Sequence, residues 1–231
     1  MGGLDKLCKK PNSPSGHFQR HLDAFLDAEK EADRQGKLSV PCYAKHSAER
    51  IVREVAVAHP HEELNNEVLE HSEAHGQLRE AQQTGVLPDG YWGHVGIKDR
   101  SAAGAFPRAV YVDGMPYRKN DGMIAWVVIN LVTGCRHLIC ILRKGELCRC
   151  GCKGWCSMWV VWRWIRWSLE ALFDGRFPSR PAPRLTWTEE QDSWGVSPLD
   201  LRGVVLYIKS DLMERSTSFT FPTWNSDTSF L

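Results

Sequence analysis

The most regular hydrophobic pattern of the chain lies in its second half, as short apolar runs that end at turn-forming residues. The run AVYVD ends at Gly114, and the run MIAWVVINLVTGCRHLICIL is interrupted by Thr133-Gly134. Apolar runs of this length, broken in this way, are typical of buried β-strands joined by tight turns. We therefore predict adjacent antiparallel strands over residues 109–113, 123–131 and 136–143.

Residues 155–173 follow the period of a helix instead. Arg163, Arg166 and Glu170 are spaced i, i+3 and i+7, so they share one helix face, while the other faces carry Trp, Val, Ile and Leu. This pattern predicts a helix packed across the sheet with one polar stripe. Its five Trp lie all around the helix, which favours a place in the core over a platform for stacked bases. A Pro-rich loop at 177–184 and a further strand at 203–208 follow.

The first hundred residues carry thinner apolar stripes among many Glu, His and Gln. Helices are predicted over 17–36, 44–57 and 61–83, and the Gly-rich stretch 84–108 predicts a linker. We expect this part to be poorly packed, because thin stripes bury too little surface to offset the loss of chain entropy.

The order strand, strand, strand, helix, strand predicts an α/β fold with an antiparallel front edge. Two parts are expected along the chain. Residues 1–107 are predicted to be a helical extension and linker of low order, and residues 108–231 are predicted to be the core.

Composition and charge exclude few classes of function. The chain has 42% hydrophobic and 25% charged residues, as in ordinary globular proteins, and a formal net charge of +1. No global field attracts nucleic acid or membrane, so contact with DNA would need a local basic patch. One such cluster is predicted near the hairpin, equally compatible with phosphate contacts or a solvated face: Arg118, Lys119, Arg136, Arg143, Lys144, Arg149 and Lys153.

The N-terminal residues have no apolar core of signal-peptide length, so we expect an intracellular protein, nuclear or cytoplasmic. Residues 123–142 and 155–173 are long enough to span a bilayer. However, a turn interrupts the first, and placing the charges of the second at bilayer depth would cost several kcal/mol. A membrane-associated protein is therefore the least favoured of three hypotheses for the function of this chain.

Four cysteines lie within nine residues, in the run CRCGCKGWC. Cysteines in an intracellular chain are expected to be thiols or metal ligands. Zinc sites usually combine separated C-x₂₋₄-C pairs, so this run can bind zinc only as a folded-back loop, which Gly151 and Gly154 permit. The candidate ligands are Cys148, Cys150, Cys152 and Cys156.

Two alternatives to this zinc site stay open at the level of sequence. Cys140 or His137 can replace one of the four ligands, or the run is a reduced, partly buried turn without metal. The histidines on the polar N-terminal segments are interpreted as solvated side chains: His59, His61, His71 and His75.

Two acidic residues follow predicted strands. Asp113 closes the first strand, and Asp211 follows the last, with Glu214 one helical turn further on. Mg²⁺ and Mn²⁺ prefer carboxylate oxygens, and two-metal phosphodiester chemistry needs acidic ligands from separate strands. The alternative interpretation is an Asp-Gly turn and the acidic first turn of a helix.

Two segments in this order resemble a known family. The run VYVDGMPYRKNDGMIAWVVINLVTGCRHLICIL and the later run LRGVVLYIKSDLMERSTSFTFPTWNS resemble parts of the catalytic domain in CACTA/Tnp2-like DNA transposases. The resemblance covers roughly residues 108–229. It implies an RNase H-like core, DNA as a partner, and Asp113 and Asp211 as the first and second ligands of Mg²⁺ or Mn²⁺.

The third acidic ligand of such enzymes lies further downstream, and no residue before Leu231 matches it. The resemblance therefore implies a partial, catalytically incomplete transposase core, with no small-molecule cofactor. The second hypothesis is a non-catalytic, zinc-stabilised interaction module built on the four cysteines. The oligomeric state stays open.

Overall fold

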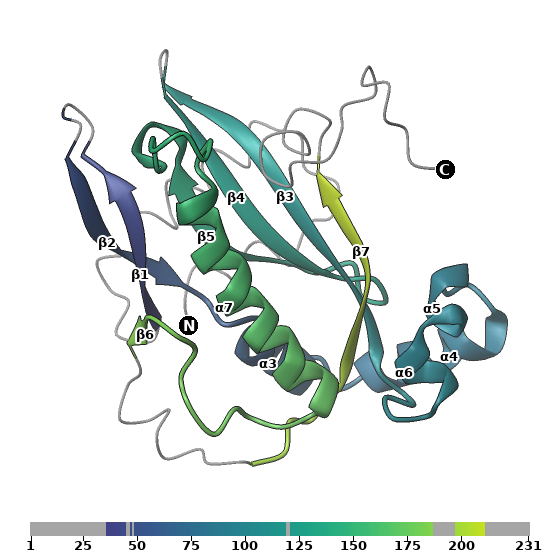
Figure 1. The fold of residues 1–231 in the computed structure, drawn as a ribbon. Helices are drawn as coiled ribbons and strands as arrows, with labels where there is room; N and C mark the ends of the chain where they lie inside the picture. Colours follow the sequence, from purple (N-terminus) through teal and green to yellow (C-terminus); the bar gives the residue numbers. More distant parts are fainter. Residues whose placement is uncertain (1–35, 45–46, 48, 119–120, 187–196, 211–231) are drawn as a thin grey trace.

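The computed structural model describes residues 36–44, 47, 49–118, 121–186 and 197–210. The fold is mixed α/β, with two sheets and several helices (Figure 1). The larger sheet has the strand order β5-β4-β3-β7 and the smaller one has the order β2-β1-β6. The strands of the larger sheet are β3 (Phe106–Arg118), β4 (Asp121–Asn130), β5 (Arg136–Arg143) and β7 (Gly203–Ser210).

The three strands predicted at the front of the core are confirmed. β3 pairs antiparallel with β4, and β4 pairs antiparallel with β5. The turn between β4 and β5 contains Gly134, whose φ of 75° lies in the left-handed region that favours glycine. The predicted fifth element is confirmed as β7, which pairs parallel with β3 at the edge of this sheet.

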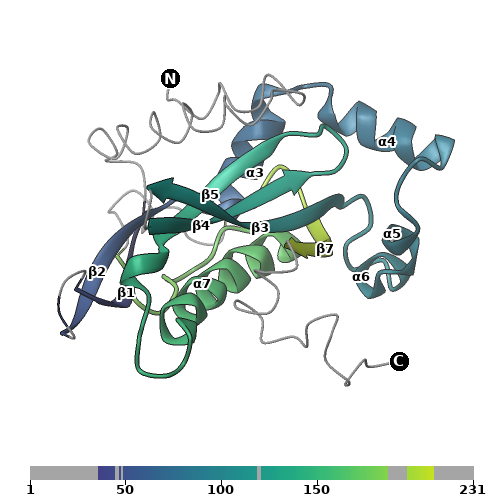
Figure 2. The ribbon, with the colours of Figure 1, turned by 90° about the horizontal axis from the view of Figure 1, so that it is seen from above.

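The predicted helix is α7 (Trp155–Asp174), which lies along one face of the four-stranded sheet (Figure 2). Trp164 and Ile165 are buried against the sheet, whereas the stripe formed by Arg163, Arg166 and Glu170 is exposed, as predicted. The interpretation of the Trp residues as core holds for Trp164. By contrast, half of the Trp159 surface is accessible.

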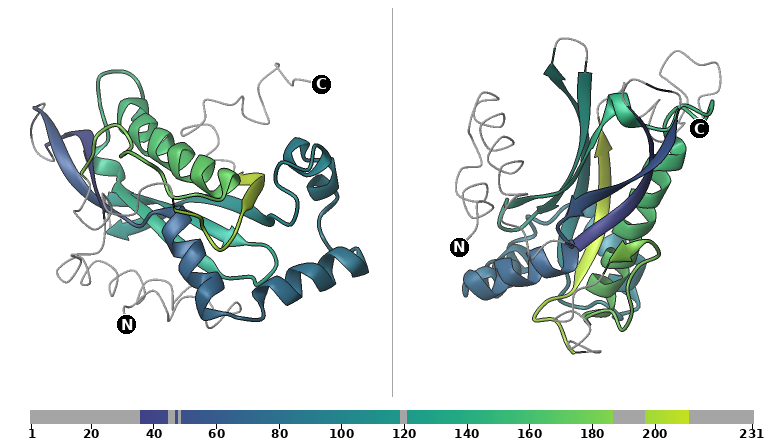
Figure 3. Two further views of the ribbon diagram at one scale, coloured as in Figure 1. Left: turned by 90° about the horizontal axis from the view of Figure 1, so that it is seen from below. Right: turned by 90° about the vertical axis from the view of Figure 1, so that its left-hand side faces the viewer.

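The smaller sheet consists of β1 (Gly36–Tyr43), β2 (Arg50–Val57) and β6 (Leu185–Thr186), and it lies beside the larger one (Figure 3). The predicted helix over 44–57 is therefore wrong. Residues 50–57 are rich in β-branched side chains, and β1 offers them a full antiparallel partner from Gly36 to Tyr43. This long-range pairing decides the conformation against the local helical pattern.

The helices predicted over 61–83 are confirmed as α3 (Pro60–Glu70) and α4 (Ala74–Thr84). Residues 84–108 are more ordered than the predicted linker, because they hold α5 (Asp89–Gly93) and α6 (Val95–Lys98) before β3 begins. Tyr91 of α5 is fully buried.

The expectation of a poorly packed extension is wrong for residues 36–107 where the structure describes them. Leu38, Val57 and Leu64 are fully buried in the same core as Val128 and Trp164. The stripes are thin, but many of their apolar residues join the common core, while Val52 and Leu69 stay exposed. The predicted helix over 17–36 lies outside the described residues, apart from Gly36 in β1. The division of the chain at residues 107 and 108 stays a prediction.

His59 and His61 correct a further prediction, because both are buried and not solvated. The indole N–H of Trp164 donates to Nδ1 of His59 over 3.0 Å, and the backbone N–H of His61 donates to Oγ of Ser168 over 3.0 Å. The two imidazoles thus fasten the start of α3 to α7. His71 is half-buried and His75 is exposed.

Among the described residues, no helix combines the length and the apolar character needed to cross a membrane. The two segments weighed for this role are the β4–β5 hairpin and α7.

Candidate metal centre

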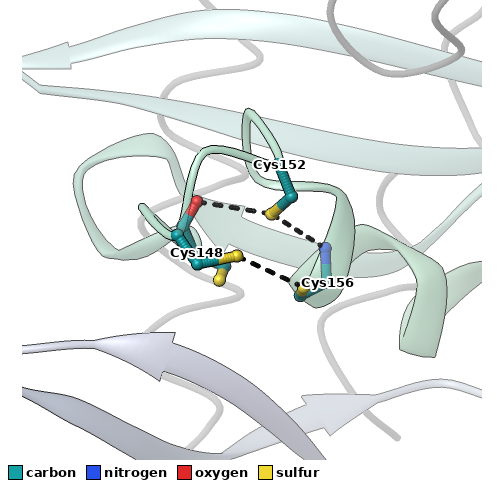
Figure 4. Close-up of side chains that lie close together, drawn as sticks. Cys148, Cys152 and Cys156 are labelled. Atoms are coloured by element: carbon teal, nitrogen blue, oxygen red, sulfur yellow. Dashed lines mark hydrogen bonds between the residues drawn. The ribbon is translucent and has the colours of Figure 1, made fainter.

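The four cysteines predicted as zinc ligands come together in the Cys loop (residues 147–154) and the first turn of α7. The Sγ atoms of Cys148, Cys150, Cys152 and Cys156 all lie within 4.8 Å of one another. Figure 4 shows Cys152 and Cys156 directed toward the same space as Cys148. The sequence prediction of one folded-back thiol site is confirmed in its geometry.

The separation of the sulfur atoms suits a tetrahedral metal ion. With Zn–S bonds of about 2.3 Å, the sulfur atoms of a tetrahedral site lie about 3.8 Å apart. Cys150 Sγ and Cys156 Sγ are 3.7 Å apart, and the largest separation among the four is no more than 4.8 Å. A zinc ion at the centre therefore requires side-chain shifts of about 1 Å or less.

The loop folds back because three of its residues adopt left-handed backbone conformations. Gly151 has φ 90°, Lys153 has φ 51° and Gly154 has φ 86°. The backbone N–H of Gly154 donates to the carbonyl oxygen of Cys148 over 3.0 Å, which closes the loop. The φ of Gly154 favours glycine, and a Cβ atom there would also lie only 3.0 Å from Leu147 Cδ1, so this side chain would have to shift.

One end of the site is anchored in the core. The backbone N–H of Cys148 donates to Oγ of Ser157 over 3.0 Å, and this hydroxyl donates to the carbonyl oxygen of Pro41 on β1. Cys148 and Ser157 are buried, Cys152 and Cys156 are half-buried, and Cys150 is exposed. The four thiols thus extend from the junction of β1 and α7 to the surface.

The thiols of Cys152 and Cys156 differ in their pKa values. Burial raises the pKa of Cys152, but the backbone N–H of Cys156, which donates to Cys152 Sγ over 3.4 Å, and neighbouring thiols outweigh it and lower this pKa to about 6. Hydrogen bonding to Cys152 and Cys150, together with burial, raises the pKa of Cys156 to about 12. The site therefore favours one thiolate even without a cation, and thiolate is the form that binds metal.

The two alternative ligands considered from the sequence are not members of this group. Cys140 is fully buried on β5, and Nε2 of His137 lies 2.8 Å from Oε2 of Glu67. Both residues belong to the interior of the fold, so among the described residues the candidate metal site consists of the four loop and helix cysteines.

The basic residues predicted as one cluster are divided between two ends of the sheet. Arg136 begins β5 and Arg143 ends it, about 23 Å away at the usual rise per residue. Arg143, Lys144, Arg149 and Lys153 are exposed around the Cys loop. The single cluster is therefore wrong for Arg136. The side chains of Arg118 and Lys119 lie outside the described part of the chain.

Asp113 lies inside β3 and not at its end, contrary to the prediction. The strand continues to Arg118 because β4 keeps pairing beyond Asp113, including Gly114 opposite Ile124. The Asp113 side chain is half-buried. Asp211 lies outside the described residues, so its distance from Asp113 stays a prediction.

No protein-family model, no curated protein and no solved structure matches this chain. Function is therefore inferred from the residues and their contacts.

A second polar cluster, which the sequence did not indicate, lies between α3 and the four-stranded sheet. Oε1 of Glu67 accepts hydrogen bonds from Asn130 Nδ2 and Thr133 Oγ1, both over 2.6 Å. Its Oε2 lies 2.8 Å from His137 Nε2 and 3.9 Å from Nη1 of Arg108. The partners come from α3, β3, the end of β4, the β4–β5 turn and β5, so no short motif could reveal them.

We call Glu67, Arg108, Asn130, Thr133 and His137 the buried ionic cluster. Its members favour the charged forms of Glu67 and His137. Burial raises the pKa of Glu67, but hydrogen bonds from His137 and Thr133 and the charge of Arg108 prevail and lower it to about 2. Burial lowers the pKa of His137, yet its contacts with Glu63 and Glu67 raise it to about 9. At neutral pH a carboxylate therefore faces an imidazolium in the core. The closed surroundings of these side chains indicate a structural role.

Proposed function

We propose that this protein is a non-catalytic, zinc-binding α/β domain, in which a Cys₄ centre holds the Cys loop against α7 and β1. The observation that carries the proposal is the convergence of four Sγ atoms within 4.8 Å of one another. Thiolates are soft ligands that select zinc over Mg²⁺ or Ca²⁺. Four protein ligands also leave no open coordination position for a substrate, which is the mark of a structural zinc site.

The proposed centre suits an interaction module because it orders an exposed surface. Arg149 and Lys153 lie within the Cys loop and are exposed, with Lys144 close by in sequence. A metal bound on both sides of Arg149, through Cys148 and Cys150, would fix the path of the backbone at this residue. The metal would thereby hold the charged side chains in one arrangement. A partner that binds them would then cause little further loss of conformational entropy.

Purified under reducing conditions with zinc in the medium, the full chain is expected to hold about one zinc ion. Cys152→Ser is expected to lose most of this zinc and to unfold at a lower temperature. Zinc at about a hundred times its Kd stabilises the folded state by about 2.7 kcal/mol. Elemental analysis and thermal melts with and without a chelator measure both effects.

The matched control is Cys135→Ser, which makes the same substitution at a buried thiol outside the group of four. This variant is expected to keep its zinc. Wild-type protein without zinc, whose four thiols all react freely with a thiol reagent, would contradict the zinc centre.

A second candidate function is a partial DDE-type transposase core with an RNase H-like fold, as the sequence resemblance implies. Support for this proposal comes from the parallel pairing of β3 with β7, in which Val112 lies opposite Ser210. These residues directly precede Asp113 and Asp211. The order of three antiparallel strands, a helix and a further strand beside the first is also compatible with such a core.

For this second candidate we expect weak Mg²⁺ binding and no cleavage of DNA by residues 1–231, because two metal ions need ligands on both sides and Asp113 and Asp211 supply only two carboxylates. Asp113→Ala is expected to leave stability nearly unchanged. Isothermal titration with Mg²⁺ and a plasmid-nicking assay check both points. Mg²⁺-dependent nicking that disappears in Asp113→Ala would contradict the inactivity. Carboxylates of Asp113 and Asp211 more than about 12 Å apart in a Mn²⁺-soaked crystal would remove the site.

A further inference from the structure

Two of the four thiols already face each other at the surface of the candidate metal centre. Cys150 Sγ and Cys156 Sγ are 3.7 Å apart, which is a van der Waals contact. A disulfide bond of about 2.05 Å needs the two sulfur atoms to approach by about 1.7 Å. Cys150 is exposed and sits between Arg149 and Gly151, so its side chain is able to make most of this movement.

The other two thiols are held in different positions by the backbone. Cys148 is buried, and its N–H and carbonyl oxygen are bonded to Ser157 and Gly154. Cys152 Sγ accepts the N–H of Cys156 over 3.4 Å and lies 3.8 Å from the carbonyl oxygen of Cys148. Solvent thus reaches Cys150 first, and the sulfur of Cys156 is in contact with it.

We propose that the Cys₄ centre is a redox-controlled zinc site, in which a peroxide converts Cys150 and Cys156 into a disulfide and thereby releases the metal. This inference rests on the proposed function, and it adds the regulation of the same site.

The chemistry balances with hydrogen peroxide as the oxidant. The thiolate of Cys150 attacks one peroxide oxygen, the O–O bond breaks, and a sulfenic acid and hydroxide form. The thiolate of Cys156 then attacks the sulfenic sulfur and displaces a second hydroxide, which forms the S–S bond. The two sulfur atoms lose two electrons, peroxide gains them, and two protons from solvent convert both hydroxides to water.

Metal release follows because the disulfide sulfurs no longer carry the negative charge that binds zinc. Only Cys148 and Cys152 remain as thiolates, and two ligands do not make a closed tetrahedral site. The ion passes into solvent, and the buried thiolate of Cys148 takes up a proton. The Cys loop is then held by its backbone hydrogen bonds and by the Cys150–Cys156 disulfide instead of the metal, so the arrangement of Arg149 and Lys153 at the surface changes.

The experiment uses the full chain, reduced and loaded with zinc, whose metal content is measured first. Hydrogen peroxide is then added, zinc release is followed with a chromogenic chelator, and disulfides are mapped by mass spectrometry after alkylation. We expect about one zinc ion released for each Cys150–Cys156 disulfide formed. Dithiothreitol and fresh zinc should restore the starting state. Cys152→Ser, which keeps the reactive pair, should form the same disulfide without zinc.

The outcomes separate the switch from the zinc centre. Reduced protein that contains no zinc would overturn the centre and the switch together. Zinc-loaded protein that keeps its metal under peroxide, or that releases it while a different cysteine pair becomes linked, would overturn the switch alone. Zinc release with separate oxidation of single thiols and no disulfide would overturn it as well.

Discussion

Replacing Glu67 by alanine is expected to lower the free energy of unfolding by about 3–5 kcal/mol, because it leaves buried cations without their counter-charge. His137 and Arg108 both lie against this carboxylate, and Arg108 is fully buried. Its guanidinium nitrogens make no hydrogen bond to the described residues. The Glu67 carboxylate and the ring of Phe106, 5.0 Å from the guanidinium carbon, stabilise its charge. Urea denaturation at neutral pH measures the loss.

Two further variants identify the cause of this loss. Glu67→Gln keeps the size of the side chain and an acceptor for Asn130 and Thr133 but removes the charge, so we expect a smaller yet substantial destabilisation. Glu70→Ala removes an exposed carboxylate from the same helix and should change stability by no more than about 0.5 kcal/mol. Equal effects of Glu67→Ala and Glu70→Ala would show that the buried ionic cluster is not a source of stability.

The joint contribution of the buried histidines to stability is expected to be greatest near pH 6.5 and to fall on both sides of it. On the acid side the cause is His59, whose pKa burial lowers to about 4. Between pH 6.5 and 4 the unfolded chain binds a proton at this residue and the folded chain does not. The free energy of unfolding therefore falls by about 3 kcal/mol as the pH is lowered through this window. Burial moves the pKa of His61 in the same direction.

On the alkaline side the cause is His137, whose folded pKa is raised to about 9. Its contribution is fully present below pH 6.5, where both states hold the proton, and it is lost as the pH rises through 9. The expected loss is again about 3 kcal/mol. Glu67, with its pKa lowered to about 2, contributes above pH 4.5 and loses its effect as the pH falls through 2.

Urea midpoints measured from pH 4 to pH 10 check this profile. His59→Gln should make the acid limb less steep, with the contribution of His61 remaining, and His137→Gln should reduce the alkaline limb while lowering stability at neutral pH. The contribution of His137 is the difference in urea midpoint between the wild type and His137→Gln, and a difference that stays constant between pH 6.5 and 9 would contradict the ion pair between His137 and Glu67.

The local pattern of the chain determined the hairpin of β4 and β5, the strand β7 and the helix α7. In each case a run of apolar residues with one period is long enough to choose its own conformation. Left-handed Gly134 turns the chain between β4 and β5, and left-handed Gly175 ends α7. The spacing of the four cysteines likewise allowed a single site. Backbone reversal within nine residues needs residues that tolerate positive φ, and Gly151 and Gly154 are visible in the sequence.

Tertiary structure decided what depends on partners far along the chain. Residues 50–57 form a strand only because β1 pairs with them, and Glu67 meets His137 only because α3 lies against β5. Strand pairing and charge pairing of this kind depend on distances in space that no local period encodes. The local sequence thus specified these elements of the core and the four cysteines that can form one site. The smaller sheet, the buried histidines and the ionic cluster were decided by the packing that brings distant residues together.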